Sequence, residues 1–143
     1  MSKLQNRLKE FLRDEGINQF TFSKICGIHH TNISSYVTFG TEPCYRHFIK
    51  MLDTMNCSAD YALGLTDIDS GERFYEPLPF GERLREILKQ KGISQEKLKK
   101  ELCISSSLIY KWVSGKSLPY PSSLVRLAKY LDCSVDYLLG RIR

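Results

Sequence analysis

The chain has 143 residues, of which 42% are hydrophobic and 26% are charged. These fractions are close to those of an average globular protein, so they exclude wholesale disorder. No apolar run approaches the roughly 20 residues that a membrane-spanning helix needs, and residues 1–10 lack the apolar centre of a secretory signal. We therefore expect a cytoplasmic protein without membrane contact.

The net charge of +5 is unevenly distributed along the chain. Residues 1–65 contain seven basic and six acidic side chains, and residues 66–79 contain one and four. Residues 80–143 contain thirteen basic and six acidic side chains, which gives this half a charge of +7. A basic half of this kind is typical of a nucleic-acid-binding protein, although a solvated basic surface explains the charge equally well.

An internal repeat determines the organisation of the chain. A shift of 76 residues aligns residues 6–65 with residues 82–141 without a gap, and 18 of the 60 aligned positions are identical. Such self-similarity indicates a duplicated structural unit. Residues 66–79, acidic and interrupted by glycine and proline, read as a linker that could reach about 48 Å if fully extended. We expect one domain at residues 1–65 and a second at residues 80–143.

The apolar spacing predicts the same five helices in each copy, and the second copy shows them most clearly. A first helix ends at Gly92, and Ser94 begins a short second helix. After a break at residues 103–105, a third helix runs to Gly115. Two prolines precede a fourth helix, and the last helix, Val135–Leu139, begins after Ser134. The predicted fold class is therefore all-α.

Residues 80–141 resemble the Cro/XRE-type helix-turn-helix family, which includes the phage lambda repressor. The resemblance rests on the segments Ser94-Gln95-Glu96-x-Leu98, Leu102-Cys103-Ile104-Ser105, Ser107-Leu108-Ile109-Tyr110-x-Trp112, Gly115-Lys116-x-x-Pro119 and Leu127-Ala128-x-x-Leu131-x-Cys133-Ser134-x-Asp136-x-Leu138-Leu139-Gly140. Through the repeat it extends more weakly to residues 4–65. Two positions depart from the family: Lys99 replaces a small residue, and Cys103 replaces the usual glycine of the turn.

The resemblance implies two tandem five-helix lambda-repressor-like domains in a sequence-specific DNA-binding transcription regulator. It suggests a repressor of bacterial or phage origin that binds double-stranded DNA, with a homodimer as one possible form. The alternative is an interaction protein of the antitoxin or anti-repressor type, whose first domain binds a protein or dimerises. Activity of the first domain on DNA discriminates between these two hypotheses.

The third helix of the second copy is the expected reading element, because a helix of its size fits the major groove. Its expected exposed positions are Ser105, Ser106, Ser107, Tyr110 and Lys111. Serine hydroxyls donate to or accept from any base edge, Lys111 suits a guanine edge or a phosphate, and Tyr110 suits a thymine methyl group. The resemblance implies a phosphate contact for Gln95, and Lys116 lies close enough to the third helix to make another.

The first copy reads as a weaker DNA binder. Its expected contact residues contain no lysine or arginine: they are Gln19, His29, His30, Thr31, Ser34 and Ser35. Phe39-Gly40 stands where the second copy has Gly115-Lys116. With a net charge of +1, this copy attracts phosphate little. It either reads DNA through these polar residues or binds a protein.

The remaining conspicuous residues favour structural roles. Tyr36 and Trp112 occupy matching inward positions of the third helices and are expected in the core. The five cysteines form no Cys-x-x-Cys pair, so reduced thiols are expected, with Cys26, Cys103 and Cys133 buried in apolar segments.

Two further patterns in the sequence have structural explanations. Cys26-x-x-His29 and Cys44-x-x-His47 superficially resemble a zinc site, but buried thiols and surface imidazoles explain them better. Asp60 and Asp136 suit the N-terminus of a helix. No catalytic motif is present, so we expect neither an enzyme nor a cofactor.

Overall fold

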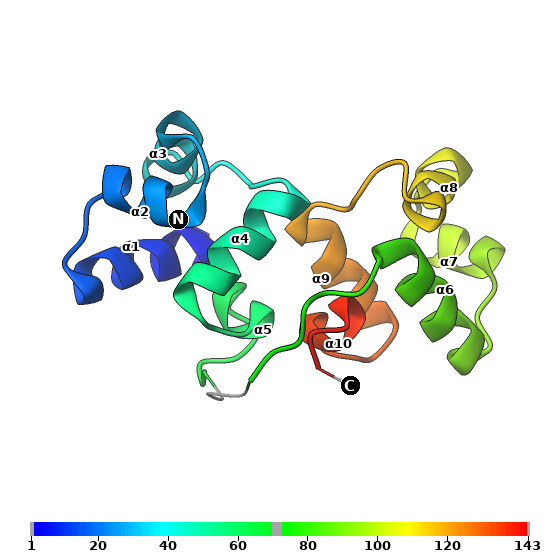
Figure 1. Ribbon diagram of the computed structural model, residues 1–143. Helices are drawn as coiled ribbons and strands as arrows, with labels where there is room; N and C mark the ends of the chain where they lie inside the picture. Colours follow the sequence, from blue (N-terminus) through cyan, green and yellow to red (C-terminus); the bar gives the residue numbers. More distant parts are fainter. Residues whose placement is uncertain (1, 70–72, 143) are drawn as a thin grey trace. The chain divides into compact units, whose positions relative to one another are not determined.

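A computed structural model describes residues 2–69 and 73–142. These residues form ten α-helices and no strand, as the all-α prediction requires (Figure 1). The chain divides into two compact units, residues 1–72 and residues 73–143. Among the described residues, no helix combines the length and the hydropathy that crossing a membrane requires.

Each unit contains the same succession of helices. The first unit contains α1 (Lys3–Glu15), α2 (Gln19–Cys26), α3 (His30–Thr38), α4 (Tyr45–Met55) and α5 (Ala59–Ala62). The second contains α6 (Phe80–Lys91), α7 (Gln95–Leu102), α8 (Ser106–Ser114), α9 (Pro121–Tyr130) and α10 (Val135–Leu139). The helices expected from the apolar spacing are thus found in both copies.

Short polar side chains fix where the helices of the second unit begin. The hydroxyl groups of Ser94, Ser105 and Ser134 each accept a hydrogen bond from the backbone N–H three residues later. Each such cap contributes about 1 kcal/mol to the helix that it begins. The chain leaves α7 at Cys103, whose φ of 53° lies in the left-handed region, where Gly27 of the first unit has a φ of 72°. The glycine expected from the family is therefore replaced without a change of turn.

Each unit has its own apolar core. In the first unit the fully buried side chains include Leu8, Phe22, Ile33, Phe48 and Met51. In the second unit they include Leu84, Ile87, Leu98, Leu124 and Leu127. Tyr36 and Trp112 are also buried, which confirms that these aromatic rings belong to the cores.

A repeated arginine contact joins the first helix of each unit to its last helix. The Nε of Arg7 donates to the carbonyl of Tyr61 at 3.1 Å, and its guanidinium lies 3.9 Å from the Tyr61 ring centroid. The Nε of Arg83 donates to the carbonyl of Tyr137 at 3.0 Å, with a distance of 4.4 Å to that ring. The sequence repeat therefore preserves a three-dimensional contact as well as an order of helices.

The two units differ where the first helix meets the third. In the first unit the Gln5 amide donates to the carbonyl oxygens of Val37 and Thr38, at 3.0 and 3.2 Å. The position equivalent to Gln5 is Gly81 in the second unit. A Cβ added to Gly81 would lie 2.3 Å from the carbonyl oxygen of Val113, so α6 approaches the end of α8 directly.

Replacing Gly81 with alanine is therefore expected to destabilise the second unit by about 1–3 kcal/mol, because overpacking against backbone atoms forces a shift. Alanine in an exposed helix would instead gain up to about 1 kcal/mol over glycine. Urea unfolding of the intact chain measures the difference. A stabilised Gly81→Ala variant would show that α6 does not approach α8 so closely.

Part of the segment expected to be a free linker packs on the second unit. Within the segment 74–79, the N–H groups of Tyr75 and Leu78 donate to the carbonyl oxygens of Arg141 and Leu139, at 2.8 and 3.0 Å. Half of the residues expected to be linker thus belong to the second unit, which shortens any free connection.

Asp136 lies in the first turn of α10, as expected, but its carboxylate forms a buried ion pair with Arg141 at 2.6 Å.

Two of the three cysteines that were expected to be buried are not buried. Cys26 is buried, as predicted, but Cys103 is exposed and Cys133 is only half-buried. Cys103 ends α7 in the left-handed turn, so its side chain cannot follow the apolar stripe of that helix. Cys57, which the apolar pattern did not single out, is buried.

Candidate nucleic-acid interface

Helix α8 packs on the core through one face and leaves the opposite face in solvent. Ile109 and Trp112 are buried, and Leu98 of α7 is buried with them. Helices α6 and α7 both pack against α8, as Figure 1 shows for the second unit. The other side of α8 is therefore free to enter a groove.

The structure exposes the residues predicted to contact DNA in the second unit. They are Gln95, Ser105, Ser106, Ser107, Tyr110, Lys111 and Lys116. Ser105 precedes the helix, and its hydroxyl oxygen accepts from the N–H of Leu108 at 3.1 Å. This oxygen is engaged in capping, so Ser106 and Ser107 are better placed to offer hydroxyl groups to a ligand.

Tyr110 and Lys116 form a pair on this exposed side. The Tyr110 side chain is 57% exposed, and the ammonium group of Lys116 lies 5.1 Å from its ring centroid. A cation over an aromatic face contributes about 0.5–1 kcal/mol at an exposed site. The ring therefore restricts the position of Lys116 at the end of α8, next to the face that carries Lys111.

Sequence reasoning missed a cationic contact that both units share. The guanidinium of Arg126 in α9 donates to the carbonyl oxygen of Leu102, at the end of α7. At the equivalent position in the first unit, Lys50 of α4 donates to the carbonyl oxygen of Gly27 at 3.4 Å. A cation at a helix C-terminus satisfies its unpaired carbonyl groups and its negative dipole end. The sequence contained a signal for this contact, since the equivalent positions Lys50 and Arg126 both carry a cation.

The first unit places its predicted contact residues less favourably. His29, His30 and Thr31 are exposed, whereas Ser34 and Ser35 are half-buried, so their expected exposure was wrong. The hydroxyl of Ser35 also donates to the carbonyl oxygen of Thr31 at 3.1 Å. Side-chain length explains the error, because the short Ser34 and Ser35 stand at the helical positions from which the longer Tyr110 and Lys111 reach into solvent in the second unit.

The remaining predicted contacts of the first unit are engaged within it. Half-buried Gln19 donates from its amide to the hydroxyl of Thr38 at 3.1 Å. His29 precedes α3, where its Nδ1 accepts from the N–H of Thr31 at 3.3 Å. The rings of His29 and His30 stack with centroids 4.4 Å apart. These contacts use part of the polar capacity that DNA readout would need.

His47 ties α3 to α4 in the first unit. The Tyr36 hydroxyl and the Nδ1 of His47 lie 2.6 Å apart. Burial lowers the pKa of His47, and the charge of Lys50 lowers it further. The Nδ1 of the neutral ring can therefore accept a hydrogen bond from the Tyr36 hydroxyl. Burial raises the pKa of Cys26, a cysteine of the other Cys-x-x-His pair, and keeps its thiol protonated.

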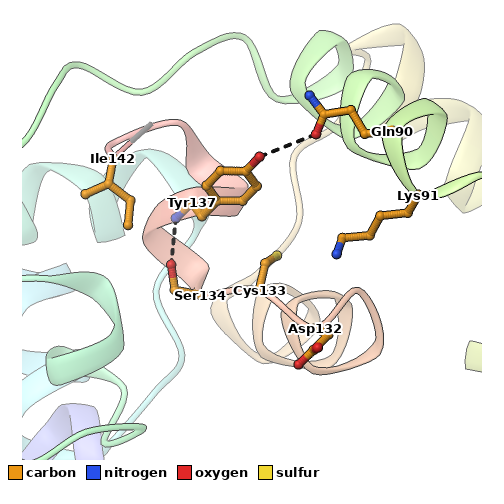
Figure 2. Close-up of a pocket in the computed structure, with 7 residues that line it drawn as sticks. All are labelled: Gln90, Lys91, Asp132, Cys133, Ser134, Tyr137 and Ile142. Atoms are coloured by element: carbon orange, nitrogen blue, oxygen red, sulfur yellow. Dashed lines mark hydrogen bonds between the residues drawn. The ribbon is translucent and has the colours of Figure 1, made fainter.

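A surface hollow of about 540 Å³ lies in the second unit, away from α7 and α8 (Figure 2). The Tyr137 hydroxyl donates to the Gln90 side chain at 3.4 Å, and the Ser134 hydroxyl caps α10. A smaller hollow of about 160 Å³ includes the equivalent residues Asp14, Cys57 and Tyr61. The hollow is therefore a property of the repeated fold. Among the described residues, no cluster of three or more His, Cys, Asp or Glu side chains could hold a metal ion.

Comparison with known proteins supports the presence of a helix-turn-helix in the second unit. The helix-turn-helix family model matches residues 84–138, which include α7, α8 and the turn between them. The chain is also 36% identical over 63 residues to the HTH-type transcriptional activator BcrR of Enterococcus faecalis. That match covers 44% of this chain and 31% of the relative, so it spans about a third of the relative's length. No solved structure matches.

Proposed function

We propose that this chain is a DNA-binding transcription regulator whose second unit reads DNA through α8. The observation that carries the proposal is the row of exposed polar side chains on α8, which lies in a segment that matches the helix-turn-helix family. In this arrangement Ser106, Tyr110 and Lys111 contact base edges, and Gln95 and Lys116 contact phosphates on either side. Base contacts specify the sequence, whereas phosphate contacts position the unit.

The charge of the two units supports a division of labour. The 26 residues from 92 to 117 contain five lysines and two glutamates, whereas residues 16–41 contain Lys24 as their single formal charge. Because phosphate attraction supplies most of the sequence-independent affinity for DNA, the second unit binds DNA and the first contributes little. The first unit is a divergent copy of the same fold.

We expect repression as the direction of regulation, because a bound domain can block a promoter by occupancy alone. Activation, the activity named for the relative, requires a further contact with the transcription machinery. Selection of bound sequences from random DNA, followed by a promoter reporter carrying the selected site, tests both parts. Lower reporter output supports repression, higher output replaces it with activation, and the absence of any enriched sequence contradicts the proposed function.

Lys116→Ala is expected to weaken binding by a similar factor on all DNA sequences. Removing one phosphate contact should reduce the slope of log affinity against log salt concentration by about one unit. Fluorescence titration at several salt concentrations measures this slope. Lys89→Ala removes the same charge from the exposed side of α6 and is the matched control. Equal slopes for the wild type and Lys116→Ala would place Lys116 outside the interface.

A further inference from the structure

The end of α8 carries an aromatic ring and a cation that are both absent from the first unit. The ammonium group of Lys116 lies 5.1 Å from the ring centroid of Tyr110, and the Tyr110 side chain is 57% exposed. The equivalent residues of the first unit are Ser34 and Gly40. The ring and the cation thus occur together, in the unit that carries the basic charge.

The turn after α8 holds the backbone of Lys116 on both sides. The N–H of Gly115 donates to the carbonyl oxygen of Trp112 at 3.3 Å. The N–H of Ser117 donates to the carbonyl oxygen of Lys111 at 3.2 Å. Lys116 therefore stands between two residues that are anchored on α8, and its side chain is the part that can still change position.

A glycine placed one position earlier makes room for this side chain. In the first unit the left-handed glycine of the turn is Gly40, with a φ of 70°, and a Cβ there would lie 2.7 Å from the Oε1 of Gln5. In the second unit the left-handed residue is Gly115, with a φ of 79°, and Gly81 replaces Gln5. The second unit can therefore carry a long cationic side chain at a position where the first unit has no space for one.

Contact with the ring restricts the remaining freedom of the Lys116 side chain. A lysine side chain loses more conformational entropy than most when it is fixed, and binding to a phosphate would fix it. A ring that holds the ammonium group near the end of α8 before DNA arrives reduces this loss, because part of the ordering has already occurred in the free protein.

We propose that Tyr110 is a positioning residue for the phosphate contact of Lys116, in addition to the base contact expected of its ring. The inference rests on the proposed DNA-binding function of α8. One side chain then links the sequence-specific and the sequence-independent parts of binding. Removing the uncharged Tyr110 side chain should therefore resemble the partial removal of a cation.

The test measures the affinity of the intact chain for random-sequence duplex DNA at several salt concentrations. Tyr110→Ala should weaken binding about two- to fivefold, the range that corresponds to a cation–aromatic contact at an exposed site. The slope of log affinity against log salt concentration should also decrease, by up to about one unit, because charged contacts release counterions. Tyr110→Phe keeps the ring and should retain both wild-type values.

A double-mutant cycle separates positioning from a direct contact between the ring and DNA. In the Lys116→Ala background, Tyr110→Ala should cause little further loss of affinity and no further change of slope. Tyr75→Ala is the matched control, because Tyr75 is also 57% exposed but lies in the segment before α6. This control should leave the slope unchanged in both backgrounds.

The pair can also be observed without DNA. In nuclear magnetic resonance spectra of the free protein, the ring current of Tyr110 should shift the side-chain proton signals of Lys116. Tyr110→Ala should abolish this shift, and Tyr110→Phe should preserve it. A wild type without the shift would overturn the proposal.

The binding results distinguish this inference from the proposed function. An unchanged salt slope in Tyr110→Ala would overturn the inference alone, as would equal losses of affinity with and without Lys116. A Tyr110→Phe variant that binds as weakly as Tyr110→Ala would also overturn it, because the hydroxyl group and not the ring would then be responsible. A wild type that binds no duplex DNA would contradict the proposed function and this inference together.

Discussion

Asp136→Ala is expected to lower the free energy of unfolding of the second unit by about 3–5 kcal/mol. The side chains of Asp136 and Arg141 are 4% and 1% exposed, and their ion pair measures 2.6 Å. Removing the carboxylate leaves a buried guanidinium without its counter-charge, which costs more than the pair itself contributes. Arg141 also lies over the Phe74 ring at 4.2 Å, so the segment that enters the second unit should loosen as well.

Asp60→Ala provides the control for this prediction. Asp60 is the repeat equivalent of Asp136, but Leu65 stands where the second unit has Arg141. Its replacement should cost less, because Asp60 is half-buried whereas Asp136 is buried. Guanidinium unfolding of both variants, followed by helical circular dichroism, measures the two effects. Equal destabilisation by the two substitutions would show that the ion pair is not responsible.

Tyr110→Ala and Lys111→Ala are together expected to remove sequence discrimination rather than all DNA affinity. Each lost base contact should cost on the order of 1–3 kcal/mol at the base that it specifies, so two positions of the site should lose their preference. The measurement is the sequence profile that each variant enriches from random DNA.

The control for Tyr110 and Lys111 removes a similar pair of side chains that lies outside α8. Gln90→Ala/Lys91→Ala deletes one cation and one polar side chain at the end of α6, beside the hollow of Figure 2. This variant should enrich the wild-type sequence. If the Tyr110→Ala/Lys111→Ala variant also enriches the unchanged sequence, α8 does not read the bases through these residues.

Local signals made much of the fold predictable. Serine before an apolar run and glycine after it marked the helices, and Ser94, Ser134 and Gly92 have the expected capping geometry. The repeat extended the assignment to the first unit, where the same pattern is weaker. Tyr36 and Trp112 were placed correctly because a helical stripe determines which side of a helix is buried.

Contacts that depend on the packing of a whole unit were not predictable in the same way. The Asp136–Arg141 pair joins two residues of one short segment, but only the packing of the whole unit buries it. The pairing of residues 75 and 78 with residues 141 and 139 depends on how the end of the second unit folds back onto its beginning. Ser34 and Ser35 were misplaced because their exposure depends on side-chain length as well as on helical position. The exposure of Phe20 and Phe39 became visible only when burial was known.

The most direct test of the division of labour compares equivalent substitutions in the two units of the intact chain. Tyr110→Ser/Lys111→Ser gives the second unit the residues that the first has at Ser34 and Ser35. His30→Ser/Thr31→Ser gives the first unit the residues of Ser106 and Ser107. In titrations of the selected site at constant salt, we expect the second-unit variant to lose at least about 100-fold in affinity. The first-unit variant should bind the selected site as the wild type does. A first-unit variant that loses affinity while the second-unit variant keeps it would contradict the assignment of DNA reading to α8.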